Sequence, residues 1–203
     1  MDKQPRIKRY ETNKDKYNTY TFLSERRKIA IREGFYLEAI NIEYAMIEER
    51  LLRFLYHCGF VENEFTRQIS QDAPCTGFLH KIGCSIPQKG LELNVGNKID
   101  IVKRTIKWSK KDPDESDPDD EYTSLLREFC CKCDEGVLGG DLTIWLKYRN
   151  EFVHGLVNKD INEVVKVWEQ KALEGRKYVG EVDKIARAVN KYGKLRKAAG
   201  WHR

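Results

Sequence analysis

A regular repeat of apolar residues between positions 37 and 55 is the feature that most constrains the fold of this chain. Hydrophobic side chains recur there at steps of three and four residues, which places them on one face of an α-helix. The repeat consists of Leu37, Ile40, Tyr44, Ile47, Leu51, Phe54 and Leu55. We expect one helix over residues 20–58, with Gly34 as its weak point and a glycine stop at Gly59.

Helical spacing continues along most of the chain, and no run of alternating polar and apolar residues competes with it. The sequence predicts a short helix at 78–82 and long helices at about 97–108, 121–136, 142–157 and 161–192. Asn97, Asp141 and Asp160 are the residues expected to cap the second, fourth and fifth of these. The predicted fold is therefore an all-α bundle of about five long helices.

Two segments are predicted to lie outside the bundle. Residues 61–90 lose the helical spacing and contain prolines and glycines, so we expect a long irregular insertion there. Residues 110–120 form an acidic loop, because the stretch DPDESDPDDE at 112–121 holds seven carboxylates and no basic residue. We expect a mobile, solvated loop, and the alternative is a strip that covers a basic surface. The domain organisation predicted is a basic N-terminal extension at 1–18 and a single helical domain at 19–198.

The charge of the chain is compatible with a polyanionic partner. Net charge is +5, and without the acidic stretch at 112–121 the rest carries about +12. RNA would satisfy such a balance, although solvated helix faces explain it almost as well. No apolar stretch is long enough to cross a membrane, and the charged start lacks the apolar core of a signal peptide. We therefore expect a cytoplasmic protein with free thiols and with no metal or other cofactor.

The segment YRNEFVHG at 148–155 places polar residues inside an apolar stretch. The spacing from Arg149 to His154 carries little information alone, because Arg50 and His57 match a similar spacing by chance. Helical periodicity adds two observations. Asn150 and His154 share one face, whereas Arg149 falls beside the apolar row that includes Trp145. A guanidinium in that row needs an anionic partner, a second protomer or a path to solvent.

The stretch RNEFVHG at 149–155, in an all-helical chain of this length, resembles the HEPN superfamily. The signature of that family is an arginine and a histidine four to six residues apart, very often with an asparagine directly after the arginine, and Arg149, Asn150 and His154 match it. The resemblance implies a helical homodimer with the motif at the interface. It also implies a metal-independent endoribonuclease of toxin–antitoxin, abortive-infection or antiviral defence systems, with an antitoxin or sensor protein as a further partner.

The chemistry that the resemblance implies suits these residue types. His154 would act as general base or acid, and Arg149 would clamp the scissile phosphate. Asn150 would orient the imidazole or donate a hydrogen bond to the phosphate. Attack by the RNA 2′-hydroxyl would leave a 2′,3′-cyclic phosphate and a 5′-hydroxyl. One histidine cannot easily be acid and base at once, so two copies facing each other would divide the roles.

Two other interpretations remain open. The first is a catalytically inert HEPN-like module that binds RNA or another protein. The second is an unrelated helical scaffold, in which His154 fills a core and Arg149 pairs with Glu43 or Glu48. Tyr148 and Trp145 lie beside the motif and could stack an RNA base, although aromatic residues at helical spacing more often belong to a core.

Overall fold

The computed structural model describes residues 13–63, 68–69, 76–84, 92–113, 120–155, 160–190 and 193–201. The side chains of residues 13, 152–155, 161 and 163 are not among those described. Over these ranges the chain forms eight α-helices and one short 3-10 turn, and it forms no strand. The all-α fold predicted from the apolar spacing is confirmed. In the described part of the chain, no helix is both long and apolar enough to cross a bilayer.

Helices α1 (Asn13–Arg32) and α2 (Tyr36–His57) follow each other around a tight turn. Gly34 occupies the left-handed region there, with φ of +78°. A helix cannot continue through that conformation, so the single helix expected over residues 20–58 is two helices. Helix α1 also includes residues 13–18, which the sequence had placed in the N-terminal extension.

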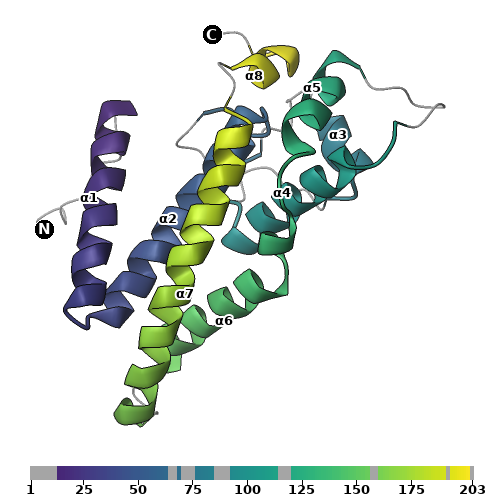
Figure 1. The fold of residues 1–203 in the computed structure, drawn as a ribbon. Helices are drawn as coiled ribbons and strands as arrows, with labels where there is room; N and C mark the ends of the chain where they lie inside the picture. The colour runs from purple at the N-terminus through teal and green to yellow at the C-terminus, as the bar shows by residue number, and fades with distance from the viewer. Residues whose placement is uncertain are drawn as a thin grey trace, which may run out of the picture.

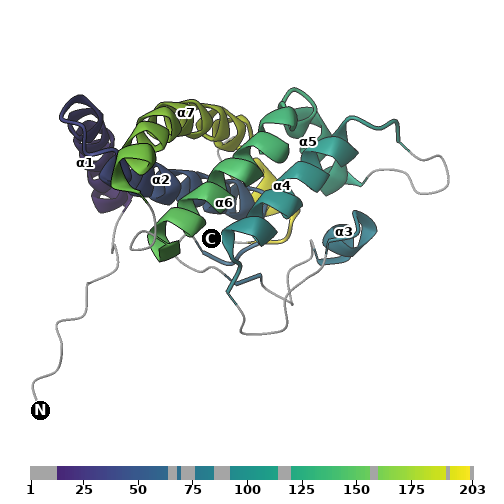
Figure 2. The ribbon, with the colours of Figure 1, turned by 90° about the horizontal axis from the view of Figure 1, so that it is seen from below.

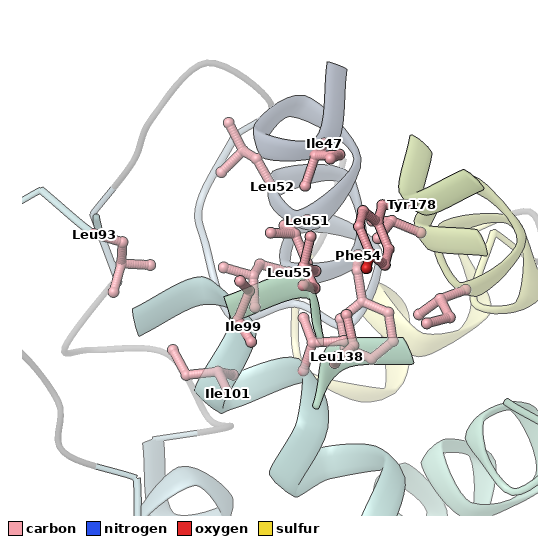
Figure 3. Packing of buried hydrophobic residues seen from close by; sticks show 14 of the residues in the cluster. Ile47, Leu51, Leu52, Phe54, Leu55, Leu93, Ile99, Ile101, Leu138 and Tyr178 are labelled. Carbon is pink, nitrogen blue, oxygen red and sulfur yellow. The ribbon is translucent and has the colours of Figure 1, made fainter. Parts of the chain in front are cut away.

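Helix α2 lies at the centre of the bundle, and five of the seven residues of its apolar repeat are buried, whereas Leu37 and Tyr44 are partly buried. Ile40, Ile47, Leu51, Phe54 and Leu55 are each at most 1% exposed. Helix α7 (Ile161–Ala188) packs along α2 in the most extensive helix pair, and α4 (Val95–Ser109) covers another side (Figure 1). Figure 3 shows side chains of α2, α4 and α7 gathered into one cluster with Leu138 of the 3-10 turn (Gly136–Leu138).

The remaining helices are α3 (Thr76–Lys81), α5 (Glu121–Cys130), α6 (Gly140–Gly155) and α8 (Lys194–Ala198). Figures 1 and 2 both show α1 at one side of α2, and α3, α4 and α5 at the other. Part of the predicted 61–90 insertion lies outside the described residues, and so do residues 114–119 of the acidic loop. Phe78 of α3 joins the bundle through edge-on contacts with Trp108 and Tyr122.

Two of the three predicted helix caps are wrong. Asn94, in an extended conformation, accepts the backbone N–H of Asn97 at 2.9 Å, so α4 begins before the residue that had been expected to cap it. Helix α6 begins at Gly140, which places Asp141 inside the first turn. The third cap is confirmed, because the Asp160 carboxylate accepts the N–H of Asn162 at 2.9 Å.

The chain after α7 closes the C-terminal end of α2. Arg196 of α8 donates to the carbonyl oxygens of Tyr56, Val61 and Glu62 at 2.8, 2.9 and 2.7 Å. The indole Nε1 of Trp201 donates to the Gly59 carbonyl at 2.8 Å. Only Tyr56 belongs to α2, so most of these bonds fix the turn that follows the helix and not the helix end itself.

Helix α1 attaches to the bundle through charged side chains as well as through a few apolar ones. Its contacts with α2 include an ion pair, a two-bond arginine–carboxylate pair and a cation–π contact. They are Lys16–Glu49 at 2.9 Å, Arg26–Glu38 at 2.5 and 2.8 Å, and Tyr20 under the Arg50 guanidinium at 3.7 Å. Arg50 in turn pairs with Asp183 of α7 at 2.7 Å, so the charged contacts extend across three helices.

Candidate functional site

Helix α6 carries the whole RNEFVHG segment, and it packs against α2, α7 and the 3-10 turn. Arg149 is half-buried on the side of α6 that faces α2. His154 lies in the last turn of α6, and its side chain is outside the described residues. The regular helix still places His154 one turn after Asn150, on the same face, as the sequence predicted.

Three side chains hold the Arg149 guanidinium. Its Nε donates to Oδ1 of Asn41 at 3.3 Å, and its Nη1 donates to Oδ1 of Asn150 at 3.1 Å. Its Cζ lies 4.1 Å from the centre of the Tyr44 ring. Asn41 is itself fixed, because its Nδ2 donates to the Leu37 carbonyl at 3.0 Å and so leaves Oδ1 for Arg149. The guanidinium is therefore positioned by α2 on two sides and by its own helix on a third.

Within the described residues, no carboxylate forms an ion pair with Arg149, and its Nη2 makes no hydrogen bond. Glu48 pairs instead with the buried Lys98 at 2.6 Å, and both Glu43 oxygens are buried with no hydrogen-bond partner in the described part of the chain. The scaffold interpretation predicted that Arg149 pairs with Glu43 or Glu48. Neither pair is formed. Stacking on Tyr44 explains how a cation sits beside the apolar row, since a guanidinium face is weakly hydrated.

Asn150 shares a helix face with His154, and its side chain also contacts Arg149. Its amide oxygen accepts from Arg149, so only the amide N–H groups remain to donate to a phosphate. The exposed Asn150 side chain is therefore a positioning group for the guanidinium. The resemblance implied a role with the imidazole or the phosphate, and a contact between neighbouring residues does not follow from helical periodicity.

Trp145 is a core residue and offers no face to a base. It is 1% exposed, its Nε1 donates to the Lys171 carbonyl at 2.8 Å, and its ring meets Tyr178 edge-on. The proposed stacking role for Trp145 is therefore wrong. Tyr148 is 39% exposed, with the Lys171 ammonium 4.8 Å from its ring centre, so it remains accessible to a partner.

An open cleft of about 1000 Å³ adjoins Arg149 between α2, α4 and α6. Tyr44 and Asn150, which both contact the guanidinium, also line the cleft. Sequence reasoning missed this cleft and placed Tyr44 in the core stripe. The sequence did hold one signal. Asn41 is a polar residue one helical turn after Leu37 and one turn before Tyr44, so this face of α2 is not wholly apolar.

The second arginine–histidine match, Arg50 and His57, forms no comparable site. Arg50 is engaged by Asp183 and Tyr20. Burial lowers the pKa of His57 to about 4, with further lowering by Arg53, Arg196 and Lys16. A histidine with that pKa stays neutral near pH 7 and is a poor general acid.

The described cysteines are free thiols, and Cys75 lies outside the described residues. Burial raises the pKa of Cys84 to about 11 and that of Cys133 to about 12, which makes both thiols unreactive. Cys130 and Cys133 have the two-residue gap of many zinc sites. Nevertheless, no group of three or more potential metal ligands occurs in the part of the chain that the structure describes.

Comparison with known proteins adds no further constraint. No family model, curated protein or solved structure matches this chain. The features that indicate a function are the geometry around Arg149 and the residue types of the RNEFVHG segment.

Proposed function

We propose that the protein is a metal-independent endoribonuclease that uses Arg149, Asn150 and His154. One observation carries the proposal: Asn41, Asn150 and Tyr44 hold the Arg149 guanidinium in place, yet its Nη2 edge has no partner among the described residues. A fixed guanidinium with an open edge suits a phosphate, because two N–H groups can meet two oxygens at once. His154 follows on the same helix and is the titratable group expected to move protons.

Side chains of this protein can supply the base, the acid and the cation that the reaction needs. The 2′-oxygen of the RNA forms a bond to phosphorus while the bond from phosphorus to the 5′-oxygen breaks. A base takes the proton of the 2′-hydroxyl, an acid gives a proton to the departing 5′-oxygen, and Arg149 stabilises the charge that builds on the phosphate. The products are a 2′,3′-cyclic phosphate and a 5′-hydroxyl. His154 of each protomer in a homodimer would supply one of the two proton transfers.

The biological setting follows from the resemblance to HEPN proteins alone. It is a cytoplasmic toxin or antiviral nuclease, restrained by an antitoxin or sensor protein. The domain that would carry the activity is the helical bundle, which includes α1 from Asn13 and extends to Trp201.

The test measures cleavage of mixed RNA in EDTA by the wild type, His154→Ala and Arg149→Ala. We expect each substitution to lower the rate by about 100-fold or more, because each removes a transition-state interaction. Arg32→Ala is the matched control, since Arg32 is an exposed arginine on α1. Cleavage that needs a divalent ion, or that survives His154→Ala, contradicts the mechanism.

Variants of Tyr44 test whether the position of the Arg149 guanidinium matters for cleavage or only for stability. Tyr44→Phe keeps an aromatic face and should keep the activity, whereas Tyr44→Leu should lower kcat without a matching loss of melting temperature. RNA binding without any cleavage would favour the inert HEPN-like module. Failure to bind RNA would favour the helical scaffold.

A further inference from the structure

The exposed side of α4 is strongly basic. Five exposed basic residues and one acidic residue lie on this side and in the two positions that follow the helix. The basic residues are Lys103, Arg104, Lys107, Lys110 and Lys111, and the acidic residue is Asp100. They lie opposite the buried row of α4 that includes Val102 and Thr105. We call the five basic residues the basic face of α4.

Two lysines of the basic face have no carboxylate of their own. The ion pairs of this face are Arg104–Asp100 at 2.8 Å and Lys110–Glu135. Lys103 and Lys107 form no ion pair with a residue that the structure describes, although Glu135 also interacts with Lys107 electrostatically. The two lysines lie one turn apart, and like charges at that spacing weaken a helix. The stability of α4 therefore does not account for them.

The basic face begins at the cleft beside Arg149. Lys103 lines this cleft together with Asn150, whose side chain holds the guanidinium. The regular helix places His154 one turn after Asn150, on the cleft side of α6. Lys107 lies one turn, or about 6 Å, beyond Lys103 along α4. The phosphate site proposed above and the basic face therefore border the same cleft.

The acidic residues of the cleft do not cancel this charge. Three of its four carboxylates are paired with basic side chains. The pairs are Glu48–Lys98 at 2.6 Å, Asp100–Arg104 at 2.8 Å and Glu151–Lys147 at 3.8 Å, and the fourth carboxylate is Glu92. Lys103, Lys107 and Arg149 thus leave a positive excess along the cleft and α4. The acidic stretch at 112–121 follows only after the end of α4 that is farther from the cleft.

We infer that the basic face of α4 binds the sugar–phosphate backbone of the RNA that is cleaved at Arg149. The inference rests on the proposed ribonuclease function. RNA is a chain of closely spaced negative charges, and basic residues arrayed along one helix face match such a partner. Contacts of this kind position a strand without reading its bases. Lys103 and Lys107 are the central contacts, because they follow the cleft and have no carboxylate of their own.

The first test measures binding of the full chain to a fluorescent single strand of 2′-O-methyl RNA over a series of salt concentrations. This probe keeps the phosphates and cannot be cleaved by attack of a 2′-hydroxyl. In Lys103→Gln/Lys107→Gln, the loss of two phosphate contacts should make the slope of log K against log salt concentration less steep by about 1.4. Binding at low salt should weaken at least about tenfold. An unchanged slope and affinity would overturn the inference.

The matched control is Lys14→Gln/Lys28→Gln. It removes the same charge from exposed positions of α1, which lies on the other side of α2 (Figures 1 and 2). Its slope and affinity should stay close to those of the wild type. Equal losses in the two double variants would show that binding follows net charge alone, and would overturn the assignment to α4. The melting temperature of Lys103→Gln/Lys107→Gln should not fall, because the substitutions remove a repulsion between like charges.

Cleavage separates this inference from the proposed nuclease. A dinucleotide has a single phosphate, which the cleavage site takes, so no phosphate remains for α4. Lys103→Gln/Lys107→Gln should therefore cleave a dinucleotide as the wild type does and should show a raised KM on long RNA. An unchanged KM on long RNA would leave the nuclease standing and overturn the role of α4. Binding of the 2′-O-methyl strand through α4 by a protein that cleaves no RNA would do the reverse.

Discussion

At the scale of single residues, Glu43 stands apart because it is a carboxylate in the interior of the bundle. It is fully buried on α2, and neither of its oxygens has a hydrogen-bond partner among the described residues. Burial raises its pKa to about 8, although Arg27 of α1 and Arg176 of α7 act in the opposite direction. Near pH 7 the side chain is therefore mostly protonated, which avoids the cost of an isolated buried charge.

Glu43 should make the protein less stable as the pH rises. The folded pKa of about 8 is above the ordinary value of 4.5, so the native state holds the proton more tightly than the unfolded state does. This stabilisation is fully present below pH 4.5 and is lost as the pH rises through 8. We expect the free energy of unfolding to fall by a few kcal/mol over that window.

Urea denaturation at pH 5 and pH 8.5 measures this effect. In Glu43→Gln the decrease should be largely absent, because the side chain no longer ionises. Glu128→Gln, an exposed position on α5, should retain the pH dependence of the wild type. If Glu43→Gln showed the same pH dependence as the wild type, Glu43 would not be the group responsible.

At this scale the sequence predicted part of the candidate site. Helical periodicity placed Arg149 beside an apolar row, and the half-buried guanidinium on Tyr44 agrees with that. The partners Asn41 and Tyr44 come from α2, 108 positions earlier in the case of Asn41. Local spacing cannot predict them, because the register of α2 against α6 depends on the packing of the whole core.

At the scale of helices, the close approach of α2 and α7 depends on Gly175. A Cβ atom at this position would overlap Oε2 of Glu43 and would lie 2.7 Å from Cζ2 of Trp145. The sequence does not reveal this requirement, since a glycine inside a helical pattern indicates only a weak point of the helix. At Gly180, one and a half turns later on α7, a Cβ atom would meet nothing within 4 Å among the described residues.

The two glycines should therefore respond to alanine with opposite signs. Gly175→Ala should lower the free energy of unfolding by about 1–3 kcal/mol, because the added methyl group forces α2 and α7 apart. Gly180→Ala should raise it by up to about 1 kcal/mol through helix propensity alone. Urea denaturation of both variants checks the pair. A stabilising Gly175→Ala would show that the helices can separate at no cost.

The elements were predictable where their signals are local. The apolar repeat identified α2, and Asp160 identified the start of α7. The N-terminal boundary of α4 was not predictable, because Asn94 and Asn97 are both good caps and only the conformation of Asn94 decides between them. The short α8 is stabilised by the contacts of Arg196 with distant carbonyls, which no local pattern encodes.

At the scale of the whole molecule, α1 differs from the other long helices in how it is attached. Among its described residues only Lys16, Arg27 and Ala30 are buried, and Phe22 is 65% exposed. Its other apolar contacts with the core come from partly buried side chains, Tyr20, Leu23 and Ile31. Ion pairs between partly exposed groups weaken as salt rises, whereas apolar packing does not. The contact of α1 with α2 should therefore be the salt-sensitive part of the bundle.

Amide hydrogen exchange at 0.1 M and 1 M sodium chloride tests this expectation. Protection of the α1 amides should fall at 1 M salt, where the screening length shrinks from about 10 Å to about 3 Å. The amides of α7 serve as the internal control, since α7 packs on α2 mainly through buried apolar side chains, with Arg50–Asp183 as a charged contact. Equal protection of α1 at both salt concentrations would show that its apolar contacts alone are sufficient.

The bonds that Arg196 makes to the end of α2 set an order of events during synthesis. Arg196 follows Tyr56 by 140 positions, so a ribosome needs on the order of 10 s to reach it after α2 has been made. During that interval α7 is not yet complete, so the apolar side of α2 lacks its main packing partner. The turn at 56–62 likewise lacks the Arg196 donor. The nascent chain thus has a long window in which a chaperone can bind α2. The fold, and with it the platform for Arg149, is completed only after translation has passed α8.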